Sequence, residues 1–183
     1  MKTYTATIST PLGALWLCAT EEGLCGVEFG GPSEGLRGAL ARYGLAVPLR
    51  EEEHPFLARA RTQIDAYFEG RVRTFDLPLE LQGTHFQRAV WQTLLRIPYG
   101  ETRAYGEVAA VLGRPRGARA VGQAVGANPV SILVPCHRVV GSDGQLTGYG
   151  GGLERKMALL ELEQDAVQLR MEGPGTSTPE EPV

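Results

Sequence analysis

The chain has 183 residues, of which 43% are hydrophobic and 21% are charged, and its net charge is −3. This is the composition of a globular protein with one ordinary domain or two small ones, and no run approaches the roughly 18 apolar residues of a membrane span. An acidic balance also argues against a nonspecific nucleic-acid binder. The start, "MKTYTATISTPLG", lacks the apolar core and cleavage site of a signal peptide, so we expect a cytoplasmic protein.

Residues 1–30 predict antiparallel strands. The runs at 3–9, 13–20 and 24–30 are β-branched or apolar, and the turn "EEG" joins the last two. A short helix is expected near 33–44. The next helix has a clearer pattern. It begins at Pro55, which suits a first helical turn, and ends at Gly70. Its apolar face is predicted to carry Phe56, Ala60, Ile64, Tyr67 and Phe68.

The second half predicts mostly helices. Thr84 and Gln87 have the T-x-x-Q spacing of a capping box at the start of a helix. One face of that helix is predicted to hold Phe86, Val90, Trp91, Leu94 and Leu95. Two short helices follow at 104–113 and 117–126, separated by "RPR", and this layout is typical of a helix-turn-helix.

The end of the chain predicts a buried strand at 132–141, a glycine-rich loop "TGYGGG" and a helix from Leu153 to about Glu163. The overall class is α+β. We divide the chain into an N-terminal α/β domain, a mostly helical C-terminal domain and a disordered acidic tail, at residues 1–80, 81–170 and 171–183.

Positive charge is concentrated in the second half. Between residues 84 and 142 the chain has seven arginines and only two acids, Glu101 and Glu107. That segment carries +5 and the remainder −8, so one face is suited to phosphate although the whole chain is acidic. The arginines are Arg88, Arg96, Arg103, Arg114, Arg116, Arg119 and Arg138.

The three cysteines, Cys18, Cys25 and Cys136, are a sparse and odd-numbered set. Without a signal peptide, this argues against a disulfide framework and for free thiols in a reducing compartment. The spacing Cys18-x6-Cys25 does not match a zinc ribbon, and we expect both residues to be small apolar fillers of strands. We predict no metal and no cofactor.

Cys136 lies in "ILVPCHRVVG", directly before His137. A redox pair, a metal ligand, a protease-like nucleophile and an inert core thiol are the alternatives. Neighbouring residues of an extended strand point to opposite faces, so these two side chains cannot simply touch. Either the backbone turns after Pro135 or the histidine acts through a water. No second cysteine is near in the sequence, and the papain-type signature is absent.

The segment "NPVSILVPCHRVVG", with "ARAVGQAVG" before it and "GYGGGLERKMALLELE" after it, resembles the O6-alkylguanine-DNA alkyltransferase family, also called methylated-DNA–protein-cysteine methyltransferases. The resemblance covers about residues 84–163, and its PCHRV core is highly specific. It implies a ribonuclease H-like N-terminal domain and DNA repair by irreversible transfer of an alkyl group from O6-alkylguanine to the protein's own cysteine. O4-alkylthymine is a second candidate substrate.

The resemblance also implies roles for particular residues. Cys136 resembles the alkyl acceptor, His137 the base that acts through a water, and Glu163 the carboxylate that orients this base. Tyr105 resembles a tyrosine that donates to guanine N3, and Arg119 an arginine that fills the gap left by a flipped nucleotide. The remaining candidates are Val139, Tyr149, Asn128 and Gly150 for the base pocket, and Ala118, Gly122 and Arg103 beside Arg119 for DNA.

The chemistry of these residue types agrees with such a reaction. A free thiol has a pKa near ~8.5 and needs a neighbouring base to attack at neutral pH. The thioether product has no carbonyl for water to attack, so we expect one turnover. Glycines and alanines dominate residues 117–126, and a helix with so few large side chains suits the minor groove, which is only ~6 Å wide.

Two positions depart from the family pattern. Ser131 stands where some members have a second proline, and Gly150 stands where others have serine. Both changes favour a roomier pocket, which would accept bulky alkyl groups.

We expect a monomer that binds duplex DNA containing O6-alkylguanine and no membrane. Two other readings stay open. One is a helix-turn-helix binding protein in which Cys136 has no chemical role, and the other is a thiol hydrolase that turns over without DNA.

Overall fold

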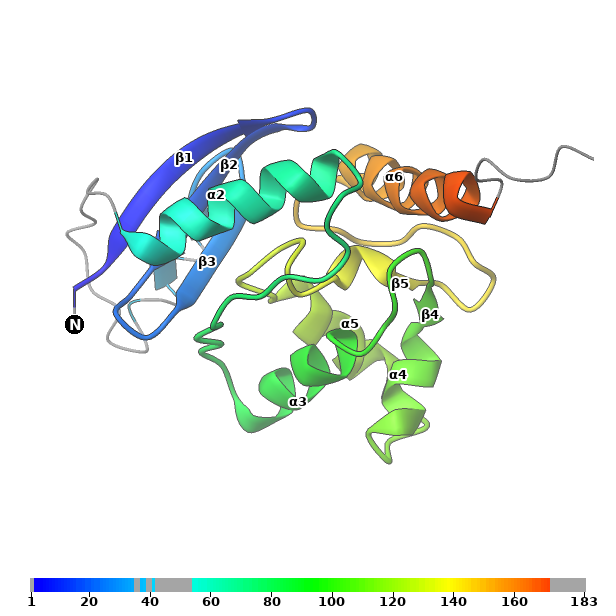
Figure 1. The fold of residues 1–183 in the computed structure, drawn as a ribbon. Coiled ribbons are helices and arrows are strands. Elements are labelled where there is room, and N and C mark those ends of the chain that lie inside the picture. Colours follow the sequence, from blue (N-terminus) through cyan, green and yellow to red (C-terminus); the bar gives the residue numbers. More distant parts are fainter. Residues whose placement is uncertain (1, 35–36, 39–40, 42–53, 172–183) are drawn as a thin grey trace, which may run out of the picture.

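The computed structural model describes residues 2–34, 37–38, 41 and 54–171 (Figure 1). Most of the short helix expected near 33–44, and the tail at 172–183, lie outside the described residues. Along the described chain, three strands come first and one helix follows them. A second helix, a two-residue strand and two more helices come next. A 3-10 turn, a second two-residue strand and a long helix complete the order.

The N-terminal sheet is antiparallel, as predicted. Strands β1 (Tyr4–Thr10), β2 (Gly13–Ala19) and β3 (Leu24–Phe29) pair in chain order. Ile8 faces Leu15 across the first pair of strands, and both side chains are buried. Gly13 has φ +108° at the tight turn between β1 and β2, a backbone conformation that favours glycine.

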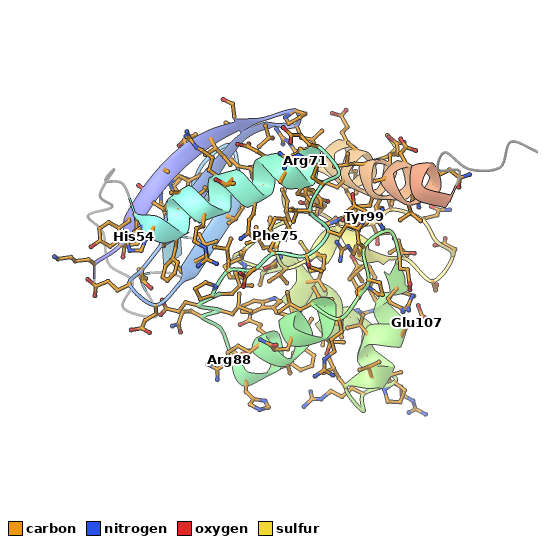
Figure 2. The ribbon with its side chains drawn as sticks, in the orientation of Figure 1. His54, Arg71, Phe75, Arg88, Tyr99 and Glu107 are labelled. Atoms are coloured by element: carbon orange, nitrogen blue, oxygen red, sulfur yellow. The ribbon has the colours of Figure 1, made fainter. Side chains whose placement is uncertain are left out.

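Helix α2 (Pro55–Phe68) covers one face of this sheet (Figure 1). Pro55 occupies its first turn, and the Phe56 amide donates to Nδ1 of His54 at 3.3 Å, so His54 caps the helix. Figure 2 shows His54 at one end of α2 and Arg71 just beyond the other. The buried face differs slightly from the prediction, since Leu57 is buried and Phe56 only partly so.

The outer edge of β3 is covered by two segments from elsewhere in the chain. The Leu24 amide donates to the Pro78 carbonyl at 2.9 Å, and the Val27 amide donates to the Pro129 carbonyl at 2.8 Å. Leu24 and Val27 therefore bridge in parallel to Leu79 and Val130. Since the second bridge comes from the segment before Cys136, the N-terminal sheet directly supports the loop that carries this cysteine.

The middle of the chain folds into three packed helices, α3 (His85–Leu94), α4 (Tyr105–Val111) and α5 (Ala118–Gly126). The predicted capping box is present, with Thr84 Oγ1 accepting from the Gln87 amide at 3.2 Å. Trp91 Nε1 donates to the Ala124 carbonyl at 2.8 Å and joins α3 to α5. Leu95 follows the end of α3 and is 39% exposed, contrary to its predicted place on the buried face.

The strand predicted at 132–141 is wrong for most of its length. Ile132 has φ +70°, and the backbone then turns through a 3-10 helix, η1 (Cys136–Arg138). Only β5 (Val139–Val140) is extended, and it pairs in parallel with β4 (Arg103–Ala104). Pro135 has no amide hydrogen to give to a sheet, and the Cys136 amide donates back to the Val134 carbonyl at 2.8 Å. These local bonds replace a sheet ladder.

The final helix, α6 (Leu153–Met171), is longer than predicted. The chain has no proline and no glycine between Leu153 and Met171, so nothing in that stretch stops a helix near Glu163. Its buried face includes Lys156, Leu159 and Glu163. Within the described part of the chain, none of the helices has the length and apolar character needed to cross a bilayer.

Candidate active site

Cys136 lies at the start of the 3-10 turn and is only 4% exposed. The turn after Pro135 changes the direction of the backbone, so Cys136 and His137 do not take the opposite faces of a strand. Asn128, just after α5, holds this loop. Its Nδ2 donates to the Val134 carbonyl at 2.9 Å and to Cys136 Sγ at 3.1 Å, and its Oδ1 accepts from the Val130 amide at 3.0 Å.

His137 and Glu163 form a fully buried pair. His137 Nε2 and Glu163 Oε1 are 2.8 Å apart, and both side chains have no exposed area. Burial raises the pKa of the Glu163 carboxyl, but hydrogen bonds from His137 and Arg138 outweigh this and bring the pKa to about 2. Burial lowers the pKa of His137. At neutral pH the pair is therefore a neutral imidazole beside a carboxylate.

This pair fixes the tautomer of His137. An ionised carboxylate can only accept, so the proton of the neutral ring lies on Nε2 and the lone pair on Nδ1. Nδ1 is buried and has no hydrogen-bond partner among the described residues. The free basic nitrogen of His137 is thus available to accept a proton through a water.

A cavity of about 250 Å³ lies against Cys136. It joins the start of α4, the outer side of α5 and the glycine-rich loop. Tyr105 lines this cavity, and its hydroxyl donates to the Thr147 carbonyl at 3.1 Å. Gly150 has open space where a Cβ would be. The residues that line the cavity are Tyr105, Gly122, Val125, Gly126, Cys136, Gly148, Tyr149 and Gly150.

A shallower hollow of about 570 Å³ adjoins this cavity and shares Tyr105 and Gly122 with it. Arg119 lies at its edge near the start of α5, is exposed, and makes no hydrogen bond or ion pair with any described residue. The hollow is lined by Tyr105, Gly106, Ala118, Arg119, Gly122, Gln123 and Ser142. Ala118 and Gly122 of α5 thus line a shallow hollow next to the cavity that contains Cys136.

Two family models together match nearly all of the described chain. The DNA binding domain of 6-O-methylguanine DNA methyltransferase matches residues 85–165, and its ribonuclease-like domain matches residues 3–81. The methylated-DNA–protein-cysteine methyltransferase of Methanosarcina barkeri is 44% identical over 163 residues, which are 88% of this chain and 98% of that protein. The chain belongs to the methylated-DNA–protein-cysteine methyltransferase family.

Other methyltransferases of this family are also similar. That of Mycobacterium leprae is 58% identical over 115 residues, which are 63% of this chain and 70% of that protein. The solved structure of Mycobacterium tuberculosis OGT in complex with DNA superposes with a TM-score of 0.78 and 44% identity, over 91% of this chain and 94% of that one. The α+β class and the ribonuclease-like N-terminal domain are thereby confirmed.

Most of the methyltransferase site residues expected from the sequence meet around Cys136, and two lie apart. Val139 is fully buried in β5 and is not among the residues that line the cavity. Arg103 is on the surface, where it forms an ion pair with Glu101 at 2.9 Å and does not line the hollow. The residues brought to the cavity or hollow are Cys136, Tyr105, Tyr149, Gly150, Gly122, Ala118 and Arg119, with Asn128, His137 and Glu163 behind the thiol.

Lys156 was missed by the sequence reasoning. It has no exposed area, and its Nζ donates to the carbonyls of Val139 at 2.5 Å, Thr147 at 2.7 Å and Gly148 at 3.3 Å. Lys156 thus links α6, on which it lies, to β5 and to the glycine-rich loop. The only signal in the sequence was a lysine among apolar residues on the face of a predicted helix.

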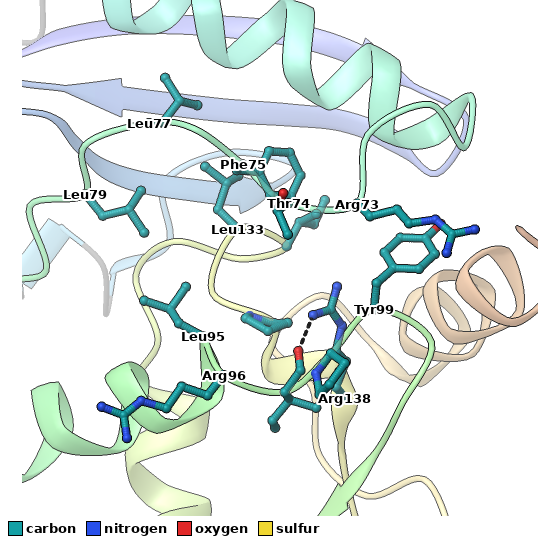
Figure 3. Close-up of a pocket in the computed structure, with 14 residues that line it drawn as sticks. Arg73, Thr74, Phe75, Leu77, Leu79, Leu95, Arg96, Tyr99, Leu133 and Arg138 are labelled. Atoms are coloured by element: carbon teal, nitrogen blue, oxygen red, sulfur yellow. Dashed lines mark hydrogen bonds between the residues drawn. The ribbon is translucent and has the colours of Figure 1, made fainter. Parts of the chain in front are cut away.

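In the sequence analysis, Arg138 was considered only as one of the seven arginines between residues 84 and 142. Its Nε and one terminal nitrogen donate to Glu163, each at 2.9 Å, and its other terminal nitrogen donates to the Ile97 carbonyl at 2.7 Å (Figure 3). It is 6% exposed, so it is part of the buried network and not of a phosphate-facing surface.

Elsewhere, Cys18 and Cys25 are free and buried on neighbouring strands, with their sulfur atoms 3.3 Å apart. Among the residues that the structure describes, no group of three or more His, Cys, Asp or Glu side chains is arranged to hold a metal ion.

Proposed function

We propose that Cys136 takes the alkyl group from O6-alkylguanine that has been flipped out of duplex DNA, and that it does so once. The chain is an O6-methylguanine DNA methyltransferase that repairs alkylated DNA. One arrangement supports the roles of these residues. The Cys136 thiol lies on the wall of a cavity, and His137 behind it is held in one tautomer by Glu163. A hollow lined by Ala118 and Gly122 adjoins this cavity.

The proposed reaction is a single displacement at carbon. The Cys136 sulfur bonds to the alkyl carbon as the bond from that carbon to guanine O6 breaks, and the electron pair passes into the purine. The thiol proton moves through a water to Nδ1 of His137, and the purine takes up a proton to leave as guanine. Because the product is a thioether, no residue of the site can reverse the step.

The environment of the thiol both opposes and favours its ionisation. Burial raises the pKa of the Cys136 thiol, while the hydrogen bond from Asn128 and the positive charge of Lys156 lower it. A thiol with a raised pKa depends on a base to become a nucleophile. This dependence supports a catalytic role for the His137–Glu163 pair.

The hollow over α5 supports a minor-groove approach. An ordinary helix with its side chains is ~10–12 Å across, and the minor groove is only ~6 Å wide, so the helix that faces it needs small side chains. Ala118 and Gly122 lie on the hollow, and Arg119 beside them is unpaired among the described residues. Minor-groove edges carry little sequence information, which suits a protein that inspects any guanine.

Replacing Tyr105 by phenylalanine should slow transfer while leaving DNA affinity nearly unchanged. The hydroxyl borders the cavity and is bonded only weakly, at 3.1 Å, to the Thr147 carbonyl, so it can turn to guanine N3 when the base enters. Oxyanion donors are worth roughly 10²–10³ in rate, and a donor to delocalised charge should be worth less, about tenfold.

The check is the second-order rate of transfer for Tyr105→Phe, with duplex affinity measured in parallel. Tyr4→Phe, on β1 and stacked on His54, is the control. A Tyr105→Phe rate equal to that of wild type would mean that the hydroxyl serves only the loop.

One experiment separates this function from the two other readings. The protein is incubated with a duplex that carries O6-methylguanine labelled in the methyl group. Alkyl transfer moves the label from the DNA to the protein. A binding module and a thiol hydrolase both leave the label on the DNA, but the binding module retains the duplex, whereas the hydrolase cleaves ester substrates repeatedly without DNA.

The monomeric state, the O4-alkylthymine activity and the acceptance of bulky groups stay part of the proposal. Gly150, with open space at its Cβ position on the cavity wall, supports the last of these. The three cysteines are free thiols, which supports a reducing, cytoplasmic location.

A further inference from the structure

The N-terminal domain places one side chain in the buried network behind Cys136. Tyr67, near the end of α2, has no exposed area, and its hydroxyl donates to Glu163 Oε1 at 2.8 Å. The two residues are 96 positions apart in the sequence. A residue of the ribonuclease-like domain is therefore bonded directly to the carboxylate that holds His137.

Glu163 accepts five hydrogen bonds from the described residues. Its Oε1 accepts from Tyr67, from Nε2 of His137 and from Arg138, and its Oε2 accepts from Arg138 and from the Gly100 amide at 3.0 Å. Burial and the neighbouring carboxylate raise the pKa of the Tyr67 hydroxyl. Tyr67 therefore stays protonated and acts only as a donor to Glu163.

An aromatic ring and two arginine side chains pack beside Tyr67. The Tyr67 ring meets the Tyr99 ring edge-on at 5.9 Å between centroids. The Tyr99 ring in turn contacts two arginines, Arg73 at 5.1 Å and Arg138 at 5.6 Å from its centroid. Figure 3 shows Arg73, Tyr99 and Arg138 together, beside the Ile97 carbonyl that Arg138 binds. This packing leaves little freedom for the Tyr67 hydroxyl to turn away from Glu163.

We propose that Tyr67 is a positioning residue for alkyl transfer, which fixes the Glu163 carboxylate and thereby sets how strongly His137 binds a proton. Through this bond the N-terminal domain takes part in the chemistry of Cys136. The inference rests on the proposed function, since it concerns the base of that reaction.

The physical reason is competition for one oxygen. Tyr67 and His137 both donate to Oε1 of Glu163, so the tyrosine bond withdraws negative charge that would otherwise stabilise protonated His137. Without the hydroxyl, the imidazolium is favoured and the pKa of His137 rises. Alkyl transfer needs the neutral imidazole, so the rate falls as pH decreases through this pKa, and in the variant that fall begins at a higher pH.

Several other titratable or charged groups face the pair, and none of them is changed by this substitution. They are Cys136 and Arg138 on the 3-10 turn, Tyr99 on the loop before Gly100, and Lys156 on α6. Arg73, after α2, faces the Tyr99 ring. A shift in the pH profile of the variant is therefore assigned to the lost hydroxyl.

The test compares Tyr67→Phe with Tyr99→Phe. Both keep a buried or half-buried ring and remove one hydroxyl, but the Tyr99 hydroxyl has no hydrogen-bond partner among the described residues. The second-order rate of methyl transfer from O6-methylguanine duplex is measured from pH 5 to pH 9. We expect Tyr67→Phe to be slowed about threefold at the acid end of this range and little at pH 8, because its acid limb moves up by roughly half a pH unit. Tyr99→Phe should follow the wild-type profile.

The outcomes distinguish failure of the proposed function from failure of the role of Tyr67. No transfer by wild type would overturn the proposed function itself. Transfer by wild type together with an unshifted acid limb for Tyr67→Phe, whatever its absolute rate, would overturn the role of Tyr67 and leave the function standing.

If Tyr67→Phe does not fold, the proposal can be tested on the wild-type protein. The hydroxyl proton of Tyr67 should give a slowly exchanging proton resonance with a cross-peak to the His137 ring, whose nitrogen shifts should report the Nε2–H tautomer. Rapid exchange of that proton, or the opposite tautomer, would also contradict the proposal.

Discussion

We expect Cys136→Ala to abolish alkyl transfer and to retain binding to the duplex. The substitution removes the nucleophile and little else, because Asn128 keeps its bonds to the Val134 carbonyl and the Val130 amide. The hollow over α5 contains no atom of Cys136 and is unaffected. The measurements are label transfer from O6-methylguanine duplex and the dissociation constant for the same duplex.

Cys18→Ala is the matched control, since Cys18 is also a free, buried cysteine but lies in the N-terminal sheet. It should transfer the methyl group as wild type does. Loss of duplex binding by Cys136→Ala to the same extent as loss of transfer would show that the residue supports the fold of the DNA-binding surface instead of the reaction.

Arg119→Ala should impair reaction with duplex DNA far more than reaction with the free modified base. A flipped nucleotide leaves an unstacked gap that costs a few kcal/mol, and a planar cation can fill it and donate to the orphaned partner base. Arg119 is exposed beside the hollow, between Ala118 and Ala120, and no described residue holds it by a hydrogen bond or ion pair. The free base needs no flipping, and the residues behind Cys136 are untouched.

The quantity to measure is the ratio of second-order rates on duplex and on free O6-alkylguanine. We expect this ratio to fall about a hundredfold for Arg119→Ala, while the free-base rate changes little. Arg116→Ala removes an equal charge from the exposed turn before α5 and should weaken duplex binding only as a phosphate contact does, with a smaller salt slope. Equal losses on both substrates for Arg119→Ala would mean that Arg119 supports the pocket and does not enter the duplex.

The regular elements could be predicted because each is specified locally. The three N-terminal strands, the capping box at Thr84 and the two helices on either side of "RPR" all follow from short-range patterns of apolar, turn and capping residues. The end of α6 was placed too early, near Glu163, although no proline or glycine between Leu153 and Met171 ends the helix there. The strand at 132–141 failed because a run of aliphatic residues predicts burial but does not distinguish a strand from a folded-back loop.

The buried network could be predicted only in part. His137 and Glu163 were assigned from the family resemblance, but nothing local in "LLELE" indicates that its last residue accepts five hydrogen bonds. Tyr67 was predicted as one apolar contact on a helix face, and its hydroxyl finds its partner only after α2 and α6 are brought together. Pairings across such sequence separations depend on the tertiary fold.

Single-turnover transfer to Cys136 is tested by the number of alkyl groups that each chain accepts. Wild-type protein is incubated with an excess of O6-methylguanine duplex, and intact mass and peptide mapping are followed over time. We expect a plateau at one methyl group per chain, on the peptide that contains Cys136, with no further reaction when fresh substrate is added. Continued consumption of substrate after that plateau, or a methyl group on the peptide of Cys18 and Cys25, would contradict it.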